Sequence, residues 1–358
     1  MPTVYFFLRP YRNKADAGFQ HRSVALAEGF RKIGVPYFSN IDYWRSGPDT
    51  EETLFRNDSS VTSTDCDVIV CEHAYYDEHK RLPEPFVRSR RKYRTVFIDS
   101  SDGWRTPASN EYRRGVDIVL KCHFNTRFAY GDNVRPWAFG LTDRIQQMLR
   151  TPLSWSARRK AILYNFRCTH PVRSIANTRF LPHLLPFFET DGTTDSEAPR
   201  GVYDGFMWDQ TGGRHHPAYY ARLASSAACA AFGGYFVPAF SSSLNSMALR
   251  AAYRLITTLH LRTSSVAQFD SSRLWESFAA GCLTFHIDLE RYGCLLPKMP
   301  TNGIHYIGVD LSKPEKEAER ILGNASSFEA VSEAGRTWCL ENYSSEATAR
   351  RFLQYLEA

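Results

Sequence analysis

Long apolar stretches are missing from this chain of 358 residues. No run of about 18 apolar residues occurs, so no membrane-spanning helix is predicted. The apolar run near the N-terminus, TVYFFL, is too short for the hydrophobic part of a signal peptide, and charged residues follow it directly. We therefore expect a soluble, cytoplasmic protein.

The motifs of several enzyme classes are also missing. Neither a Gly-x-Gly-x-x-Gly, a P-loop, a Gly-x-Ser-x-Gly nor a His-Glu-x-x-His motif occurs in a fitting context. Rossmann dehydrogenases, nucleotidyl hydrolases, serine esterases and zincins therefore lack their defining residues here. His215 and His216 are adjacent, but no third ligand follows at a useful spacing, so we expect no metal site and no cofactor.

The eight cysteines include no Cys-x-x-Cys pair, and several lie inside apolar runs such as VIVCEH. This pattern is typical of buried, reduced thiols rather than of a disulfide framework or a zinc site.

Charge of one sign is only mildly in excess, since 44 basic and 38 acidic residues give a formal charge of +6. This balance suits an anionic ligand such as a nucleotide diphosphate and falls short of a nucleic-acid-binding signature, so we expect no nucleic-acid partner. The basic run RSRRKYR, residues 88–94, is typical of a solvated helix end. Peripheral contact with an anionic membrane or an acidic polymer acceptor is the functional alternative.

Short apolar runs alternate with amphipathic stretches through the first half, which indicates a parallel sheet with helices on both faces. The predicted strands, each ending in polar residues, are 3–8, 35–40, 67–72, 95–100 and 117–122, with a helix near 22–33. A Pro- and Gly-containing segment, 133–140, predicts a domain boundary, followed by a polar helical stretch to 156.

The alternation restarts in the second half. Predicted there are strands at 161–166, 233–240, 257–263 and 282–288, helices at 217–232, 245–255 and 272–280, a helix opening after 170, and a long surface loop over 189–214. SSEATARRFLQYLEA predicts a capped terminal helix with Ser344 or Ser345 at its N-cap. Together the patterns predict an α/β protein with an N-terminal domain over 1–140, a C-terminal domain over 150–343 and a terminal helix over 344–358.

The most informative segment is SSRLWESFAAGCLTFHID, in which a serine-rich loop leads into a helix and then a strand. A helix N-terminus that follows small residues is suited to bind an anion, because its free N–H groups and its dipole face the ligand. Ser271 and Ser272 add hydroxyl donors, and Arg273 can form a fork on a phosphate. Glu276, one turn later, can accept hydrogen bonds from vicinal hydroxyls such as those of a ribose, and the helix end favours its ionised form.

This segment resembles the nucleotide-binding segment of GT-B glycosyltransferases, and is most similar to the CgeB-like and exostosin-like groups. The closing run EAGRTWCLENYSSEATARRFLQYL and the upstream YYARLASSAACAAFGG resemble the same groups, so the resemblance covers about 140 residues from Tyr219 onward. It implies two Rossmann-like domains facing each other across a cleft, with the terminal helix 344–358 packed back on the first domain. It also implies a glycosyltransferase (a hexosyl- or related transferase) acting without metal on a UDP- or GDP-type nucleotide-sugar.

The resemblance also implies roles for individual residues. Glu276 would bind the ribose, and Ser272 and Arg273 would lie near the diphosphate. A basic side chain at the first turn of the second half would meet the diphosphate; Arg167 is our choice there, and Arg262 is a similar candidate. Many retaining GT-B enzymes have a glutamate where this chain has Gln268, so retaining or inverting stereochemistry stays open.

A base for the acceptor hydroxyl is expected where the N-terminal strands end, because open α/β sheets bind ligands there. Three places qualify: Asp16 with His21, Glu72 with His73, and Asp99 with Asp102, where Trp104 could stack on a sugar. We favour His73 and Asp102. The acceptor could be a glycan, a glycolipid or a protein. The rival hypothesis is a non-catalytic carbohydrate- or nucleotide-binding protein on a degenerate GT-B fold.

Overall fold

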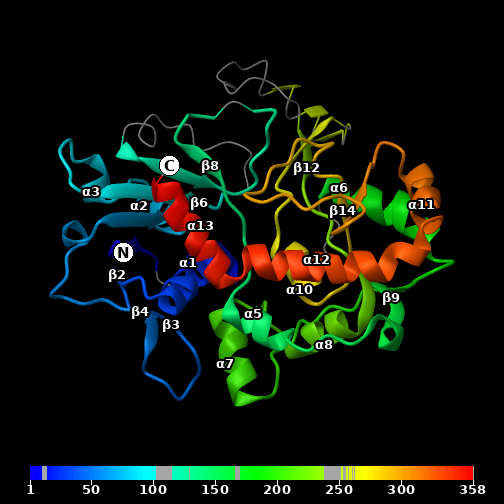
Figure 1. Ribbon diagram of the computed structural model, residues 1–358, viewed down its shortest axis with the longest axis horizontal. Coiled ribbons are helices and arrows are strands. Elements are labelled where there is room, and N and C mark those ends of the chain that lie inside the picture. Colours follow the sequence, from blue (N-terminus) through cyan, green and yellow to red (C-terminus); the bar gives the residue numbers. More distant parts are fainter. Residues whose placement is uncertain are drawn as a thin grey trace.

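The computed structural model describes residues 1–9, 14–101, 115–128, 130–165, 170–237, 251–252, 255–256, 258–259, 261 and 263–357. Two parallel sheets lie in two lobes side by side (Figure 1). In both sheets the second strand lies outside the first, and the remaining strands continue on the first strand's other side. The edge between the first and third strands is therefore a topological switch point, where open α/β sheets place ligands.

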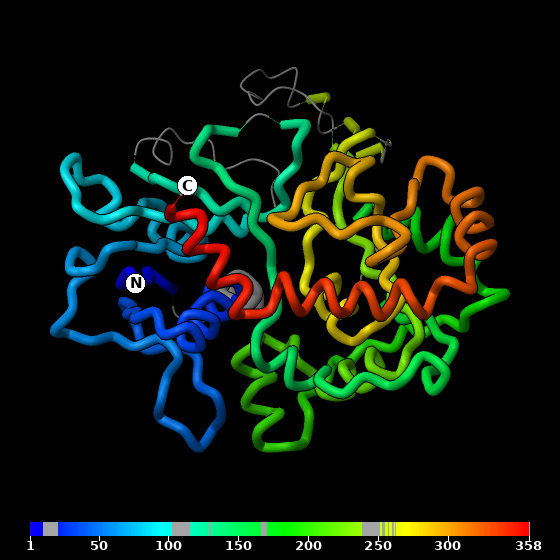
Figure 2. Tube along the Cα trace, viewed as in Figure 1, coloured from blue at the N-terminus to red at the C-terminus, as the bar shows by residue number. Residues whose placement is uncertain are grey.

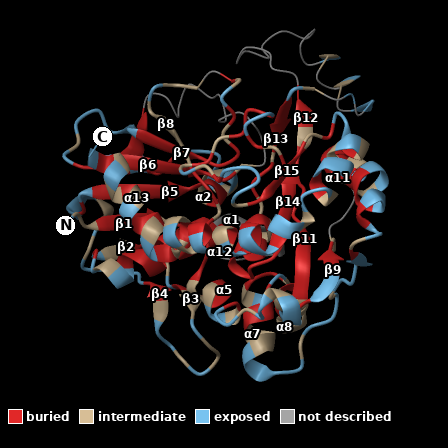
Figure 3. Ribbon diagram, turned by 45° about the vertical axis from the view of Figure 1, so that its right-hand side comes forward, coloured by how far each residue is buried: buried red, intermediate tan, exposed pale blue. Residues whose placement is uncertain are grey.

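The first sheet has six strands in the order β2-β1-β5-β6-β7-β8. Its strands are β1 (Val4–Phe7), β2 (Tyr37–Ser39), β5 (Val68–Glu72), β6 (Arg94–Asp99), β7 (Ile118–Lys121) and β8 (Val134–Pro136). The helices are α1 (Lys14–Ile33), α2 (His73–His79) and α3 (Glu84–Val87), and β3 (Tyr43–Arg45) pairs with β4 (Thr53–Phe55) as an antiparallel two-stranded sheet. The inner strands are buried along their apolar residues, as Figure 3 shows, because helices or loops cover both faces.

The second sheet has five strands in the order β10-β9-β11-β14-β15. They are β9 (Arg159–Leu163), β10 (Glu189–Asp191), β11 (Ser226–Ala230), β14 (Leu283–Ile287) and β15 (Ile307–Val309); β12 (Tyr235–Val237) pairs with β13 (Ser265–Ala267) separately. The α-helices here are α5 (Asp143–Met148), α6 (Pro171–Ile175), α7 (Val202–Gln210), α8 (Pro217–Ser225), α10 (Ser272–Ala279), α11 (Pro314–Leu322) and α12 (Phe328–Tyr343). The π segment Ala176–Phe180 and the 3-10 turn Leu181–Leu184 continue α6.

The last helix returns to the first lobe. Helix α12 runs across the second lobe, and α13 (Ser345–Glu357) leads the chain back beside α1 (Figure 2). Ala349 and Phe352 of α13 are buried in the same core as Phe30 of α1. The approach is close at Gly29, where an added Cβ would lie 2.0 Å from the carbonyl oxygen of Ser345. The limits of the two domains at residues 140, 150 and 343 stay predictions.

Most predicted strands are confirmed within one or two residues, but four segments differ from expectation. The alanine-rich stretch predicted as helix up to 232 leaves the helix at Ser225 and forms the central strand β11, because tertiary packing overrides alanine's helix propensity there. The predicted loop 189–214 contains the edge strand β10 and helix α7. Helix α1 begins at Lys14, inside a predicted loop. Leu255, Ile256 and residue 258 are helical, so the strand predicted at 257–263 is wrong where it is described.

Seven cysteines are described, and all seven are free and buried, as predicted; Cys168 lies outside the described residues. No helix in the described part of the chain is both long and apolar enough to cross a membrane.

Candidate nucleotide-binding site

A cavity of about 900 Å³ opens at the switch point of the second sheet. Asn165 lines it directly beyond β9, and Arg173 lines it from α6. The amino end of α10 contributes Ser271, Ser272 and Arg273. Because the chain leaves β9 and β11 toward opposite sides at a switch point, a crevice that a ligand can enter is expected there.

Ser271 is the N-cap residue of α10, with extended backbone angles of φ −147° and ψ 154°. Its Oγ atom is buried and neither donates nor accepts a hydrogen bond within the described part of the chain. The first N–H groups of a helix have no intrahelical partner, so a serine that does not cap them leaves them available to a ligand. The predicted anion site at this turn therefore faces the cavity.

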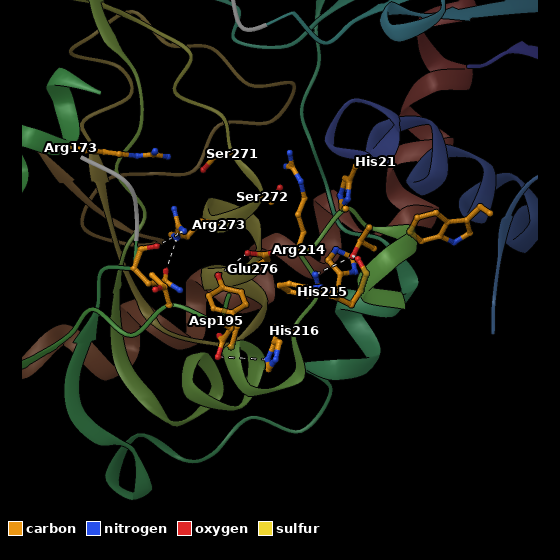
Figure 4. Close-up of a pocket in the computed structure, with 18 residues that line it drawn as sticks. His21, Arg173, Asp195, Arg214, His215, His216, Ser271, Ser272, Arg273 and Glu276 are labelled. Atoms are coloured by element: carbon orange, nitrogen blue, oxygen red, sulfur yellow. Dashed lines mark hydrogen bonds and ion pairs between the residues drawn. The ribbon is translucent and has the colours of Figure 1, made fainter. Parts of the chain in front are cut away.

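Three arginines gather around this turn. Arg273 is held by Asn165, to which its Nε donates at 3.2 Å (Oδ1) and its guanidinium at 3.1 Å (backbone oxygen). The Nε of Arg173 donates to the carbonyl oxygen of Phe232 at 2.8 Å. Figure 4 shows Arg173 and Arg214 directed toward the space beside Ser271 and Ser272. The three guanidinium groups give this end of the cavity a strong positive charge.

Glu276 lies in the same cavity wall, one turn into α10, and is only 6% exposed. Its Oε2 accepts a hydrogen bond from the Tyr219 hydroxyl at 2.8 Å, and its Oε1 accepts one from Tyr220 at 3.1 Å. A carboxylate has about four acceptor positions, so two stay available. Burial raises the pKa of Glu276, opposed by both tyrosine hydrogen bonds and by Arg273. This direction is opposite to the one that the helix end alone predicts.

The first lobe contributes His21 from α1 and Trp44 from β3 to the cavity. The Nε2 of His21 lies 3.3 Å from the carbonyl oxygen of Gly140. Burial lowers the pKa of His21 to about 4, so its ring is neutral at neutral pH. The cavity is thus lined from both lobes, with a neutral imidazole on the first-lobe side.

The His-His pair has structural contacts. His216 is the N-cap of α8, and its Nδ1 accepts a hydrogen bond from the N–H of Ala218 at 3.1 Å. The His215 ring lies 6.5 Å from that of His21, and burial lowers its pKa well below the usual value. Among the residues that the structure describes, no group of three or more histidine, cysteine and acidic side chains could hold a metal ion.

His73 lies away from this cavity, in a buried polar cluster where β5, β6 and β7 end. Its Nδ1 is 3.9 Å from Asp99 Oδ1, and the Lys121 ammonium is 3.1 Å from Asp99 Oδ2. Ser100 donates to Glu72 at 3.1 Å. Burial raises the pKa of Glu72 to about 7 and lowers that of His73. The structure therefore brings Glu72, His73 and Asp99 together, as expected for the ends of adjacent parallel strands, but His73 is not among the residues that line the cavity.

Three predicted site residues, Asp102, Arg167 and Arg262, lie outside the described residues. Of the others, Ser271, Ser272, Arg273 and Glu276 line one cavity. Sequence reasoning missed Arg214 and Trp44 as site residues, and at the first turn of the second half it chose Arg167, whereas the described residue that lines the cavity there is Arg173. The signal for Arg214 was the Gly212-Gly213 pair before it, since both glycines adopt positive φ and turn the chain toward the cavity.

No protein-family model matches this chain, and no curated protein does. Solved structures do match. An α-glucosyltransferase in complex with UDP-glucose and DNA containing an abasic site is 12% identical, with 100% of both chains covered and a TM-score of 0.55. AviGT4, a glycosyltransferase involved in avilamycin A biosynthesis, is 12% identical, with 100% of this chain and 97% of that chain covered and a TM-score of 0.51. This chain has the GT-B fold.

An α-glucosyltransferase in complex with UDP also matches this chain, with 11% identity, 100% of both chains covered and a TM-score of 0.54. The two parallel sheets are accordingly the two Rossmann-like domains of that fold, and the cavity lies between them, with His21 and Trp44 on one side and α10 on the other. At these identities the likeness concerns the fold, and the narrower resemblance to the CgeB-like and exostosin-like groups stays a prediction.

Proposed function

We propose that the protein is a glycosyltransferase that moves a sugar from a nucleotide-sugar, of the UDP or GDP type, to a hydroxyl group of a glycan, glycolipid or protein. The observation that carries this proposal is the uncapped amino end of α10, which opens into a cavity lined by three arginines. Phosphate groups bind at such helix ends because N–H groups, dipole and cationic side chains all favour negative charge there.

The diphosphate of the donor would lie between Ser271, Ser272 and the guanidinium groups of Arg173, Arg214 and Arg273. In the reaction, the bond from the sugar's anomeric carbon to the phosphate oxygen breaks and its electron pair stays on the leaving diphosphate. Fixed cationic groups stabilise that developing charge. Three arginines supply this stabilisation without a metal ion, which supports a metal-independent reaction.

Glu276 would bind the ribose, because its two remaining acceptor positions can take hydrogen bonds from the vicinal hydroxyls. Tyr219 and Tyr220 hold the carboxylate in one orientation, so little entropy is lost when a ligand binds. The acceptor hydroxyl must lose its proton as the new bond to the anomeric carbon forms. His73 and Asp102 are the proposed bases favoured from the sequence. His21 is a further candidate and, unlike His73, lines the cavity with a neutral ring.

Calorimetric titration with UDP, GDP and ADP tests the donor site. Glu276→Gln keeps the shape of the side chain and removes its charge, and Glu319→Gln on the surface of α11 is the matched control. A hydrogen bond to a charged group contributes about 1.5–3 kcal/mol, so Glu276→Gln should weaken the bound nucleotide about 10- to 100-fold. Unchanged affinity in Glu276→Gln would contradict the proposed ribose contact.

Incubation with UDP-, GDP- and ADP-sugars then separates the enzyme from the rival binding protein. Release of free nucleotide from one sugar donor, lost in Arg273→Lys, supports the transferase. Tight binding of the same donor with no turnover would support the binding protein.

A further inference from the structure

The basic run 88–94 forms one wall of a groove that the donor site does not use. This groove has a volume of about 1,210 Å³ and lies where β6, β7 and β8 begin. The cavity with α10 lies in the other lobe, beyond the carboxyl end of β9 in the second sheet. Six basic side chains line the groove, against the two acidic ones Asp117 and Asp132: Arg88, Arg90, Arg91, Lys92, Arg94 and Arg135.

The groove wall has a defined shape because its inward-facing residues are bonded. Arg91 donates to the carbonyl oxygens of Phe86 and Gly115 at 3.1 and 2.9 Å and to Asp117 at 2.7 Å. The Tyr93 hydroxyl donates to the carbonyl oxygen of Pro85 at 2.9 Å. These bonds hold the loop in one conformation, so a ligand need not order it.

The outward-facing residues supply the charge. Arg88, Arg90, Lys92 and Arg94 are exposed. Within the described chain, neither Arg90 nor Lys92 has a side-chain hydrogen bond or ion pair, whereas Arg88 pairs with Glu84. The six basic and two acidic side chains give the groove lining a net formal charge of +4. A local charge of this kind attracts a polyanion over about a Debye length, 10 Å at 0.1 M salt.

The shape and composition of the groove distinguish between polyanions. A bilayer is flat and its binding is helped by exposed large apolar side chains, of which the described wall offers only Val87, 68% exposed. Single-stranded nucleic acid needs several exposed aromatic faces for its bases. Of the aromatic residues that line this groove, Phe86 and Tyr93 are buried, and Tyr355 is half-buried with its hydroxyl bonded to the carbonyl oxygen of Pro136 at 3.2 Å. A chain that carries anionic groups but no bases fits a concave, arginine-lined surface, since guanidinium groups form forked hydrogen bonds to carboxylate and sulfate.

We propose that this groove binds an anionic polysaccharide, through carboxylate or sulfate groups along its chain. The groove would hold such a polymer on the first domain while the cavity at α10 stays open to other ligands. This inference goes beyond the proposed transfer reaction and does not depend on it, because the groove lies on the first sheet and shares no lining residue with the cavity at α10.

Fluorescence anisotropy with a labelled heparin dodecasaccharide tests the proposal. The variant Arg90→Ala/Lys92→Ala removes two exposed charges whose side chains make no hydrogen bond or ion pair within the described chain. The control Lys313→Ala/Lys316→Ala, at the N-cap and in the first turn of α11, removes the same charge from the other lobe (right-hand side of Figure 1). We take the logarithm of the affinity to fall by about 0.7 per neutralised charge for each unit of log salt concentration. Contacts from the four exposed basic residues then predict about a 50-fold loss of affinity between 50 and 200 mM salt. The groove variant should lose only about sevenfold over that range and bind more weakly at 50 mM salt.

The control variant should behave like the natural protein, and all three should bind UDP equally. Equal heparin binding by the groove variant and the control would overturn the proposal. Tighter binding to an oligothymidine strand, or to phosphatidylglycerol vesicles, than to the dodecasaccharide would overturn the assignment to a polysaccharide. If none of the three proteins binds UDP, the proposed donor site is refuted, whereas the heparin comparison still decides on the groove.

Discussion

The buried ion pair between Asp99 and Lys121 gives a prediction whose size follows from the structure. Neither side chain is exposed, and the Lys121 ammonium is 3.1 Å from Asp99 Oδ2. Asp99→Asn keeps an acceptor for the Ser101 N–H and hydroxyl, and Lys121→Met keeps the length of the side chain. Each single variant therefore leaves one buried charge without its counterion, and Lys121→Met also removes the hydrogen bond from the ammonium to the Ser101 hydroxyl at 3.2 Å.

At an effective dielectric constant of about 20, two unit charges at this separation attract by about 5 kcal/mol. Removal of one partner of a buried pair costs about 3–5 kcal/mol, because the remaining charge stays out of water. The double variant leaves no uncompensated charge, so its loss should be smaller than the sum of the two single losses. We expect a coupling free energy of about 2 kcal/mol or more.

Urea and thermal unfolding of the four proteins measure this coupling. Each single variant should unfold about 10 °C below the natural protein, given about 2–4 °C per kcal/mol for a domain of this size. If both single variants lose less than about 1 kcal/mol and their losses add, the pair is not the buried, low-dielectric contact described here. His73, whose Nδ1 is 3.9 Å from Asp99, should then also lack the electrostatic environment that supports its proposed role.

Two further predictions concern the contacts of α1. Burial raises the pKa of Glu28 to about 8, above its value in the unfolded chain, so the folded protein loses stability as the pH rises from about 4.5 to 8 and the buried carboxyl ionises. This loss amounts to about 5 kcal/mol, and Glu28→Gln should remove it when thermal melting is followed against pH. An identical pH profile in the variant would refute this. In thermal melting, Gly29→Ala should lower the free energy of unfolding by about 1–3 kcal/mol, because the new Cβ would lie 2.0 Å from the carbonyl oxygen of Ser345. The control Gly205→Ala on α7, where the nearest atom to the new Cβ is 3.6 Å away, should not lower it. Equal melting of the two alanine variants would contradict the close packing.

The sequence was most informative where local pattern and tertiary role agree. Strands such as β5 and β14 are short apolar runs with polar ends, and α10 is an amphipathic segment that follows a serine-rich loop and ends just before Gly281, so period and boundary signals coincide. The central strand β11 could not be recognised, because SAACA has helix-forming composition and its extended conformation depends on pairing with β9 and β14.

The site residues that are neighbours in one segment could be predicted from the sequence, whereas those that tertiary packing brings together from separate segments could not. Ser271, Ser272, Arg273 and Glu276 are neighbours in sequence, so a helix period alone brings them together. Arg214, His21 and Trp44 come from three other elements, and only the packing of the two sheets brings them to the same cavity. The burial of Glu276 beneath Tyr219 and Tyr220 also depends on α8, which no local pattern links to α10.

A crystal structure with UDP bound tests the central claim most directly. The account predicts the diphosphate at the amino end of α10, within hydrogen-bond distance of Ser272 and Arg273, and the ribose hydroxyls on the Glu276 carboxylate. A nucleotide bound at any other place, with the cavity beside α10 unchanged, would contradict it.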